Sequence, residues 1–187
     1  MVNALIVYGT RLGTTASTSE EIAKVLREEG LDVRVIDAKK EKVKDVAGYD
    51  LVLVGSGIAM GKWMGEPEDF LKKFRGELIR KKVALFVSCG SASPSPTVKP
   101  EAVAQARKSY LDDKAAQYGL NPIALGFFGA AYDYNNMPWW ASMFMKSAKK
   151  DLMASGARET KPGLYDSRDW DAIRGWASEL AAKARSG

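Results

Sequence analysis

Small and hydroxylated residues follow the first apolar run of the chain and precede a helical pattern. The run from Val2 to Val7 leads directly into this segment. Backbone N–H groups, threonine hydroxyls and the positive end of a following helix can all point at one anion. Gly13 can adopt the positive φ that lets several amides converge. We therefore expect a phosphate-binding loop, formed by Thr10, Arg11, Leu12, Gly13, Thr14 and Thr15.

The spacing in this loop excludes two common nucleotide-binding motifs. A P-loop needs a lysine directly after its last glycine, and no lysine follows Gly13. The dinucleotide-binding motif needs three glycines in the pattern G-x-G-x-x-G, which is also missing. A hydroxyl-rich loop without a lysine suits a single terminal phosphate.

Alternating strand and helix patterns predict the scaffold that positions this loop. Short continuous apolar runs suit strands that are buried on both faces, as in a parallel sheet covered by helices. Helical apolar stripes lie between the runs, and Thr18 with Glu21 resembles a capping box at the first helix. The chain is therefore expected to form a doubly wound α/β fold as one domain, residues 1–187. The predicted strands are 4–7, 33–36, 51–54, 83–87 and 123–128.

Two further loops follow predicted strands and suit a planar heterocycle. In such a sheet, ligands bind beyond the carboxyl ends of the strands. Residues 56–65 offer three glycines for close backbone approach, and Met60, Trp63 and Met64 for packing on a ring. Residues 88–93 offer amides and hydroxyls for the ring edge. Together the three loops predict flavin mononucleotide (FMN), with its ring near Ser56, Gly57, Met60, Gly61, Trp63, Ser88, Cys89, Gly90, Ser91 and Tyr132.

Two of these ring-site residues, Trp63 and Cys89, have a structural interpretation beside the functional one. Trp63 either stacks on the ring or caps the neighbouring helix. Cys89 follows a buried strand, where a small apolar thiol usually packs rather than reacts. Tyr132 follows the fifth predicted strand and can reach the ring edge from there.

The first loop resembles that of the flavodoxins, which reads [TS]-x-[TS]-G-x-[TS]; Thr10, Gly13 and Thr15 match it. The T-R-x-G-x-T form and the glycine-rich residues 55–61 are similar to the flavodoxin-like family that includes menaquinone-dependent protoporphyrinogen oxidase. The resemblance implies FMN as cofactor and a five-stranded parallel sheet in the order 2-1-3-4-5. It also implies that a peptide at one glycine of residues 57–61 turns its carbonyl toward flavin N5, the alternative being turn geometry alone.

Two features of this loop depart from ordinary flavodoxins. Leu12 stands where these proteins carry a hydroxyl, which removes one phosphate donor. Residues 16–19 look like extra residues before the helix, so a longer or reshaped loop is expected, with Thr14, Ser17 or Thr18 replacing the lost donor. Arg11 either neutralises phosphate charge or faces solvent.

Residues 129–166 form a long insertion before the last helix, far longer than an ordinary connection. Tryptophan, methionine, phenylalanine and lysine gather in residues 137–150 and predict a helix there. This helix can make peripheral contact with a membrane surface, bury its aromatic side chains in a homodimer interface, or form a local core.

Composition limits the remaining function classes. The 187 residues, 46% of them hydrophobic, suffice for one substantial core. A lone cysteine excludes an internal disulfide, and the absence of a signal peptide or bilayer-spanning run predicts a cytoplasmic protein. The chain has no histidine, which excludes histidine metal sites and the usual general base. With a net charge of +5 and interspersed acidic residues, no nucleic-acid partner is predicted.

These observations predict an FMN-binding flavodoxin that transfers electrons between redox partners, such as ferredoxin-type or iron–sulfur donors and acceptors. The flavin carries the redox chemistry, and the protein tunes it without needing histidine. The alternative is a flavin-dependent oxidoreductase of the protoporphyrinogen oxidase or quinone-reductase type, as the resemblance implies. A third interpretation is a non-redox module that binds another phosphate ligand.

Overall fold

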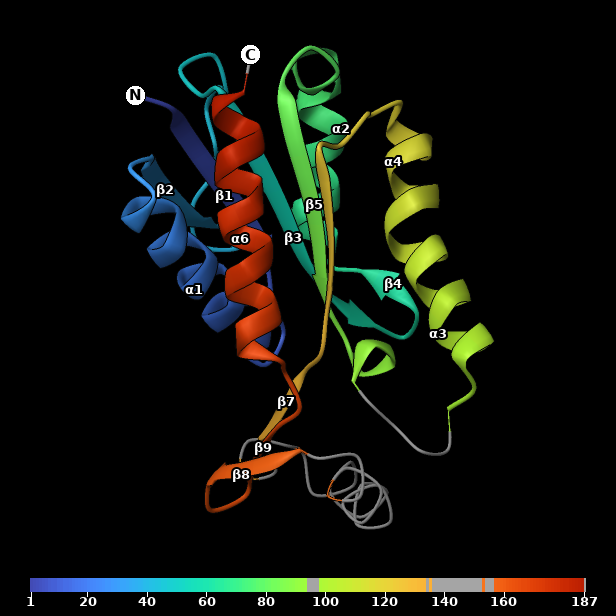
Figure 1. Ribbon diagram of the computed structural model, residues 1–187. Coiled ribbons are helices and arrows are strands. Elements are labelled where there is room, and N and C mark those ends of the chain that lie inside the picture. Colours follow the sequence, from blue (N-terminus) through green and yellow to red (C-terminus); the bar gives the residue numbers. More distant parts are fainter. Residues whose placement is uncertain (94–97, 134, 136–152, 154–156, 187) are drawn as a thin grey trace.

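The five predicted apolar runs form one parallel sheet in a computed structural model, which describes residues 1–93, 98–133, 135, 153 and 157–186 (Figure 1). Its order is β2-β1-β3-β5-β6, which confirms the predicted order 2-1-3-4-5. A short strand, β4 (Lys62–Trp63), pairs antiparallel with β3 outside this path. The parallel strands are β1 (Asn3–Gly9), β2 (Asp32–Asp37), β3 (Leu51–Ala59), β5 (Lys82–Ser88) and β6 (Ala124–Phe128).

Two helical layers cover the two faces of this sheet. The helices α1 (Thr14–Glu28) and α6 (Trp170–Arg185) pack on one face. The other face carries α2 (Gly65–Leu78) and a rod made of α3 (Pro100–Arg107), a π-helical turn (Lys108–Asp112) and α4 (Asp113–Tyr118). Each layer buries an apolar stripe that the sequence predicts, such as Phe70, Leu71, Phe74 and Leu78 of α2.

The central strands are apolar throughout because both of their faces are buried. In β1, Leu5 and Val7 pack with α2, whereas Ala4 and Ile6 pack with α1 and α6. Successive side chains of a strand point to opposite faces, so a strand between two helical layers has no polar side.

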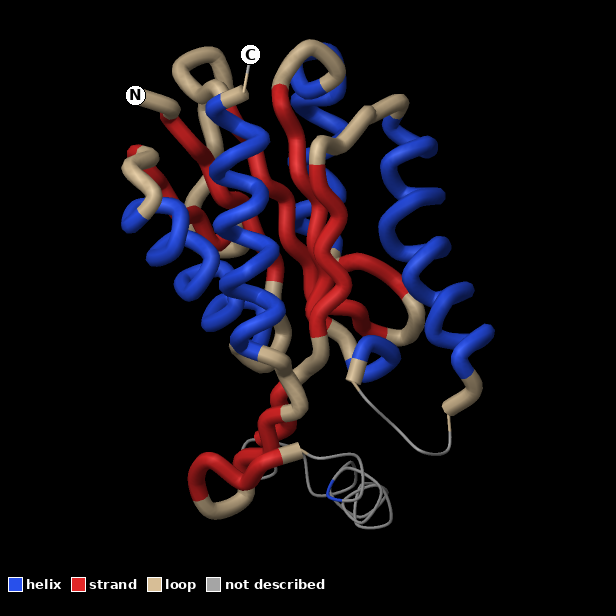
Figure 2. The backbone as a smooth tube through the Cα atoms, viewed as in Figure 1, coloured by secondary structure: helices blue, strands red, loops and turns tan. Residues whose placement is uncertain are grey.

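The carboxyl ends of β1, β3 and β5 meet at one edge of the sheet (Figure 2). Gly9 of β1 pairs with Ser56 of β3, and Gly57 of β3 pairs with Ser88 of β5. The register therefore brings the three loops of the predicted FMN site side by side.

The first helix begins earlier than the sequence suggested. Gly13 has φ 85° and precedes the first helical residue, Thr14. The expectation that residues 16–19 lengthen the loop is therefore wrong, because they already belong to α1. Thr18 does not cap the helix; its hydroxyl donates to the Thr14 carbonyl oxygen, 3.0 Å away, from within the first turns.

The described part of the insertion forms a second, antiparallel sheet in the order β7-β9-β8. It comprises β7 (Ala131–Asp133), β8 (Arg158–Lys161) and β9 (Leu164–Asp166). This inserted sheet projects from the carboxyl edge of the main sheet (Figure 1). The helix predicted in residues 137–150, with its dimer and membrane contacts, lies outside the described residues. Within the described ranges, no helix is long and apolar enough to cross a membrane.

Gly55 in β3 lies against the ring of Phe86 in β5, and this close packing is testable. A Cβ atom at Gly55 would lie 2.1 Å from Phe86 Cζ. We expect Gly55→Ala to lower the free energy of unfolding by about 1–3 kcal/mol, since overpacking forces the core apart. Urea denaturation of the purified protein measures this change.

Gly76→Ala in α2 is the matched control, because a Cβ atom there meets nothing within 4 Å. Alanine favours a helix over glycine, so this variant should gain about 0.5–1 kcal/mol. Equal stability changes in the two variants would contradict the packing argument.

Candidate functional site

A cavity of about 340 Å³ opens at the carboxyl edge of the main sheet. Its volume falls within the range of small-molecule sites, about 300–1,000 Å³. The lining comes from the loops after β1, β3 and β5 and from the start of the inserted sheet. The predicted residues that line it are Thr10, Arg11, Leu12, Thr14, Thr15, Gly57, Met60, Ser88, Cys89, Gly90 and Tyr132.

The N-terminus of α1 faces this site without a side-chain cap. The Gly13 N–H donates to Thr10 Oγ1 at 3.0 Å, which closes the loop before the helix. No side chain of the described residues caps α1, and its first turn holds no acidic residue. By contrast, Asp169 caps α6, and Glu66 and Glu68 occupy the first turn of α2. The first amides of α1 and its positive dipole end are therefore available to an anion.

The hydroxyl of Thr15 is a second feature, beside the N-terminus of α1, that suits the binding of an anion. Its side chain is fully buried, and among the described residues none hydrogen-bonds to its Oγ1. A buried hydroxyl without a partner costs about 1–3 kcal/mol. A Cβ atom at Gly57 would lie 3.2 Å from this oxygen, so the glycine lets the β3 backbone come close to it. A ligand oxygen at this position would remove the cost.

The β3–β4 hairpin forms one side of the cavity. Met60 and Gly61 join the two strands and both have positive φ, 51° and 76°, as in a two-residue type I′ turn. Such a φ is uncommon for a residue other than glycine. Ser56 fixes the base of the hairpin: its hydroxyl donates to the Gly57 carbonyl oxygen and accepts from the Met64 N–H, at 2.8 and 2.9 Å.

The prediction that Trp63 stacks on the ligand ring is wrong. Its side chain is buried in the core and lies outside the cavity lining. The indole N–H donates to the Tyr110 carbonyl oxygen at 2.9 Å, on the π-helical turn. Because adjacent strand residues face opposite ways, Lys62 is exposed while Trp63 points inward. Four further predicted residues also lie outside the lining: Gly13, Ser56, Gly61 and Ser91.

Cys89 lies in the cavity wall as a packing residue. Burial raises the pKa of its thiol to about 11, although hydrogen bonds from the Ala92 and Ser91 backbone act in the opposite direction. The thiol is therefore protonated at neutral pH and is a poor nucleophile. Its backbone N–H donates to the Phe128 carbonyl oxygen at 3.0 Å, which links β5 to β6 beside the site.

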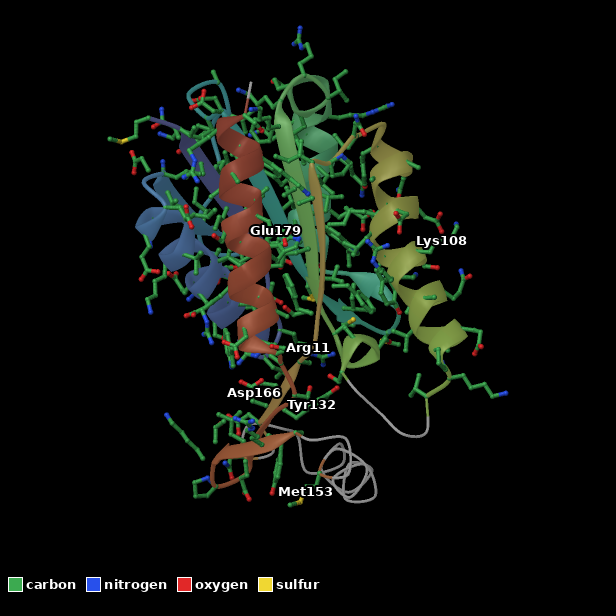
Figure 3. All side chains as sticks on the ribbon, viewed as in Figure 1. Arg11, Lys108, Tyr132, Met153, Asp166 and Glu179 are labelled. Carbon is green, nitrogen blue, oxygen red and sulfur yellow. The ribbon has the colours of Figure 1, made fainter. Side chains whose placement is uncertain are left out.

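The inserted sheet supplies the remaining wall. Thr14 Oγ1 donates to the Ala131 carbonyl oxygen at 3.0 Å, which joins the first turn of α1 to β7. A Cβ atom at Gly90 would lie 2.3 Å from the Tyr132 hydroxyl, so this hydroxyl lies against the loop after β5. Figure 3 shows Tyr132 and Arg11 at the same end of the molecule, and both line the cavity.

Sequence reasoning missed some of the lining. Met64 lines the cavity as predicted for ring packing, but Ile58, Ala59, Ala130 and Ala131 were not predicted. Ile58 and Ala59 lie within the predicted second loop, so their position was the available signal. Ala130 and Ala131 follow β6 and carry no polar side chain, so no residue-type signal could have found them.

Comparison with known proteins agrees with this geometry. The model of the family described as Flavodoxin domain matches residues 5–160. Protoporphyrinogen IX dehydrogenase (quinone) of Escherichia coli strain K12 is 23% identical over 181 residues, which cover 96% of this chain and 95% of that protein. A flavodoxin of Clostridium beijerinckii is 34% identical over 88 residues, 46% of this chain and 63% of that protein.

Solved flavodoxins share the fold. A flavodoxin of Streptococcus pneumoniae TIGR4 superposes with a TM-score of 0.59 at 18% identity, covering 97% of this chain and 99% of the other. An archaeal flavodoxin gives a TM-score of 0.56 at 17% identity, covering 99% of this chain and all of the other, 100%. Since the family model covers most of the sequence and the sheet order agrees, this chain belongs to the flavodoxin domain family.

Proposed function

We propose that this protein binds FMN in the cavity at the carboxyl edge and transfers electrons between redox partners. The observation that carries the proposal is the N-terminus of α1 beside the buried hydroxyl of Thr15, neither of which has a side-chain partner among the described residues. Both are features of an anion site, and both border a cavity of ligand size.

The residues of the cavity divide by chemistry into two groups. The first-turn amides of α1 and the hydroxyls of Thr10 and Thr15 would hold the phosphate. Met60, Met64 and Tyr132 would border the flavin ring, with glycine backbone close beside them. When bound, FMN supplies the redox chemistry, while the protein sets its environment through packing, amide hydrogen bonds and charge.

A second candidate function is a flavin-dependent oxidoreductase that acts on a small-molecule partner. Similarity to the E. coli protoporphyrinogen IX dehydrogenase (quinone) extends over 96% of this chain, whereas the C. beijerinckii flavodoxin aligns with 46% of it. The inserted sheet also contributes Ala131 and Tyr132 to the cavity. A wall of this kind restricts which molecules can reach the ring, as an enzyme with a small substrate requires.

The proposed function predicts that the protein binds FMN through its phosphate. The purified protein should be yellow, and protein freed of flavin should bind one FMN per chain with quenching of flavin fluorescence. Riboflavin should bind more weakly because it lacks the phosphate that α1 would hold. A protein that is colourless and cannot be reconstituted with FMN would contradict the proposal.

Thr15→Val should change ligand binding and stability in opposite directions. Valine has nearly the same shape but no hydroxyl, so FMN affinity should fall about tenfold while riboflavin affinity stays the same. The flavin-free protein should gain about 1 kcal/mol in free energy of unfolding, because an unpaired buried hydroxyl is removed. Fluorescence titration and urea denaturation measure the two effects.

Thr18→Val is the control for Thr15→Val. The Thr18 hydroxyl donates to the Thr14 carbonyl oxygen and accepts from Arg168, so its loss should destabilise the flavin-free protein. If Thr15→Val also destabilises it, or weakens FMN and riboflavin equally, Thr15 does not contact the phosphate.

Electron transfer to a protein can be separated from turnover of a small molecule by following reoxidation of the reduced protein. The proposed carrier should pass electrons faster to a ferredoxin-type iron–sulfur protein than to a soluble quinone in stopped-flow measurements. The second candidate function predicts saturable reduction of the quinone, weakened by Tyr132→Ala because Tyr132 borders the cavity. Saturable quinone turnover with slow transfer to the iron–sulfur protein would replace the carrier proposal by the second one.

A further inference from the structure

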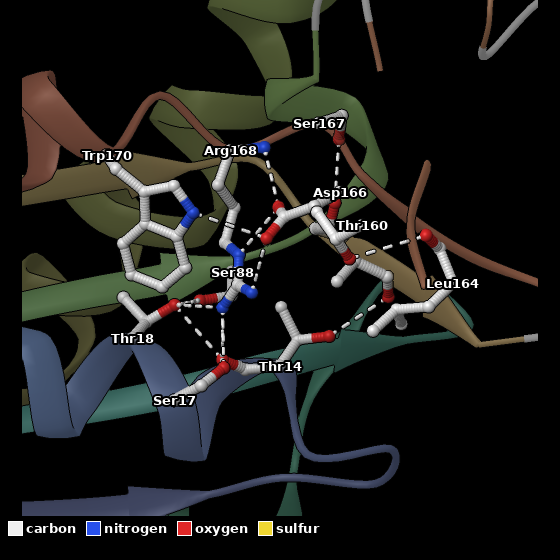
Figure 4. A network of polar contacts seen from close by, with 12 residues as sticks. Thr14, Ser17, Thr18, Ser88, Thr160, Leu164, Asp166, Ser167, Arg168 and Trp170 are labelled. Carbon is white, nitrogen blue, oxygen red and sulfur yellow. Dashed lines mark hydrogen bonds and ion pairs between the residues drawn. The ribbon is translucent and has the colours of Figure 1, made fainter. Parts of the chain in front are cut away.

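Arg168 lies at the junction between the inserted sheet and α6, with its side chain turned away from solvent (Figure 4). Its side chain is 6% exposed. Its Nε and Nη2 donate to the two carboxylate oxygens of Asp166, at 2.9 and 2.8 Å. The guanidinium carbon also lies 4.1 Å from the centre of the Trp170 ring. A two-pronged ion pair and a stacked ring together fix the plane of the guanidinium.

The third guanidinium nitrogen of Arg168 is directed at the first turns of α1. Its Nη1 donates to the Thr14 carbonyl oxygen, Ser17 Oγ and Thr18 Oγ1, at 3.1, 2.6 and 3.2 Å. Thr14 is the first residue of α1 and lines the cavity. A side chain that follows the inserted sheet therefore holds the helix that would bind the phosphate.

A second contact closes a ring of interactions around this junction. Thr14 Oγ1 donates to the Ala131 carbonyl oxygen, and Ala131 pairs with Asp166 in the inserted sheet. The contacts thus run from Asp166 through Arg168 and Thr14 to Ala131 and return to Asp166. Because Thr14 and Ala131 both line the cavity, this ring couples two of its walls.

Charge alone does not explain why an arginine occupies this place. A cation beside the first turn of a helix opposes the helix dipole, so Arg168 gives α1 no electrostatic benefit. Burial acts to raise the pKa of Asp166, but the hydrogen bonds and charge of Arg168 outweigh it and lower this pKa. Asp166 is therefore ionised at neutral pH, and its negative charge opposes that of the guanidinium with which it pairs. The role of Arg168 therefore lies in the geometry of its contacts, which hold α1 and the inserted sheet together, and not in its charge.

We propose that Arg168 is a positioning residue for the phosphate of the bound flavin. It holds the first turn of α1 so that its amides and Thr15 face the cavity, and it keeps the inserted sheet against that turn. The inference rests on the proposed binding of FMN. Arg168 itself lies outside the cavity lining and acts through Thr14, Ser17 and Thr18.

The test compares Arg168→Gln with Arg174→Gln. Arg174 lies in α6 and, like Arg168, reaches α1, where it donates to Glu21 at 2.9 Å, but it is 44% exposed and lies outside the cavity lining. Dissociation constants for FMN and riboflavin are measured by fluorescence titration, and unfolding curves check that each variant folds. Arg168→Gln should weaken FMN about tenfold and riboflavin less than about twofold. Arg174→Gln should leave both affinities unchanged.

Arg168→Lys separates position from charge. Lysine keeps the positive charge, but a single ammonium cannot span both the Asp166 carboxylate and the first turn of α1. The ratio of FMN affinity to riboflavin affinity should therefore fall in Arg168→Lys by almost as much as in Arg168→Gln. Full recovery of the ratio by lysine would overturn the positioning role and leave only charge.

Ser17→Ala keeps the inference testable if Arg168→Gln does not fold. Ser17 lies outside the cavity lining, and alanine is favoured in a helix, so α1 should remain intact. Loss of one Arg168 contact should weaken FMN relative to riboflavin about two- to threefold. An unchanged ratio in folded Arg168→Gln, or in Ser17→Ala where Arg168→Gln does not fold, would overturn this inference and leave the proposed function standing. A wild-type protein that binds no FMN would overturn the proposed function and this inference with it.

Discussion

Gly13 is the residue whose backbone conformation fixes both the start of α1 and the shape of the candidate site. With φ 85°, it turns the chain from the end of β1 directly into a helix at Thr14. The first amides of α1 consequently face the edge where β3 and β5 also end. A residue with a Cβ atom rarely adopts this conformation, so an L side chain here would strain the turn on which the candidate site depends.

The site keeps two features that a fold selected for stability alone would avoid. Thr15 carries a buried hydroxyl to which none of the described residues hydrogen-bonds, and Met60 has a positive φ. Such features cost free energy and are found where a ligand makes use of them. The main sheet can support them because its central strands are buried on both faces between two helical layers.

The strands and their order could be predicted from the sequence because each run is apolar on both faces, and a parallel sheet requires this pattern. The three loops at the cavity could be predicted as well, since each comes directly after one of those apolar runs. The direction of Trp63 could not be predicted, because it depends on the pairing of the two-residue strand β4 with β3. The contacts of Arg168 could not be predicted either. In the sequence it is one arginine between a strand and a helix, and its partners Ser17 and Thr18 lie about 150 residues away.

The inserted sheet gives this flavodoxin-domain protein a wall that is fixed at both sides of its base. On one side, Ser93 and Ser167 hydrogen-bond to each other and to the backbone of Ala130. On the other side, Arg168 holds α1 through its first turns. A sheet joined to the domain only by its two chain crossings would be free to pivot away from the cavity. Fixed at both sides, it forms one wall of the cavity together with the loops after β1, β3 and β5, so any molecule that enters the cavity meets both the loops and the inserted sheet.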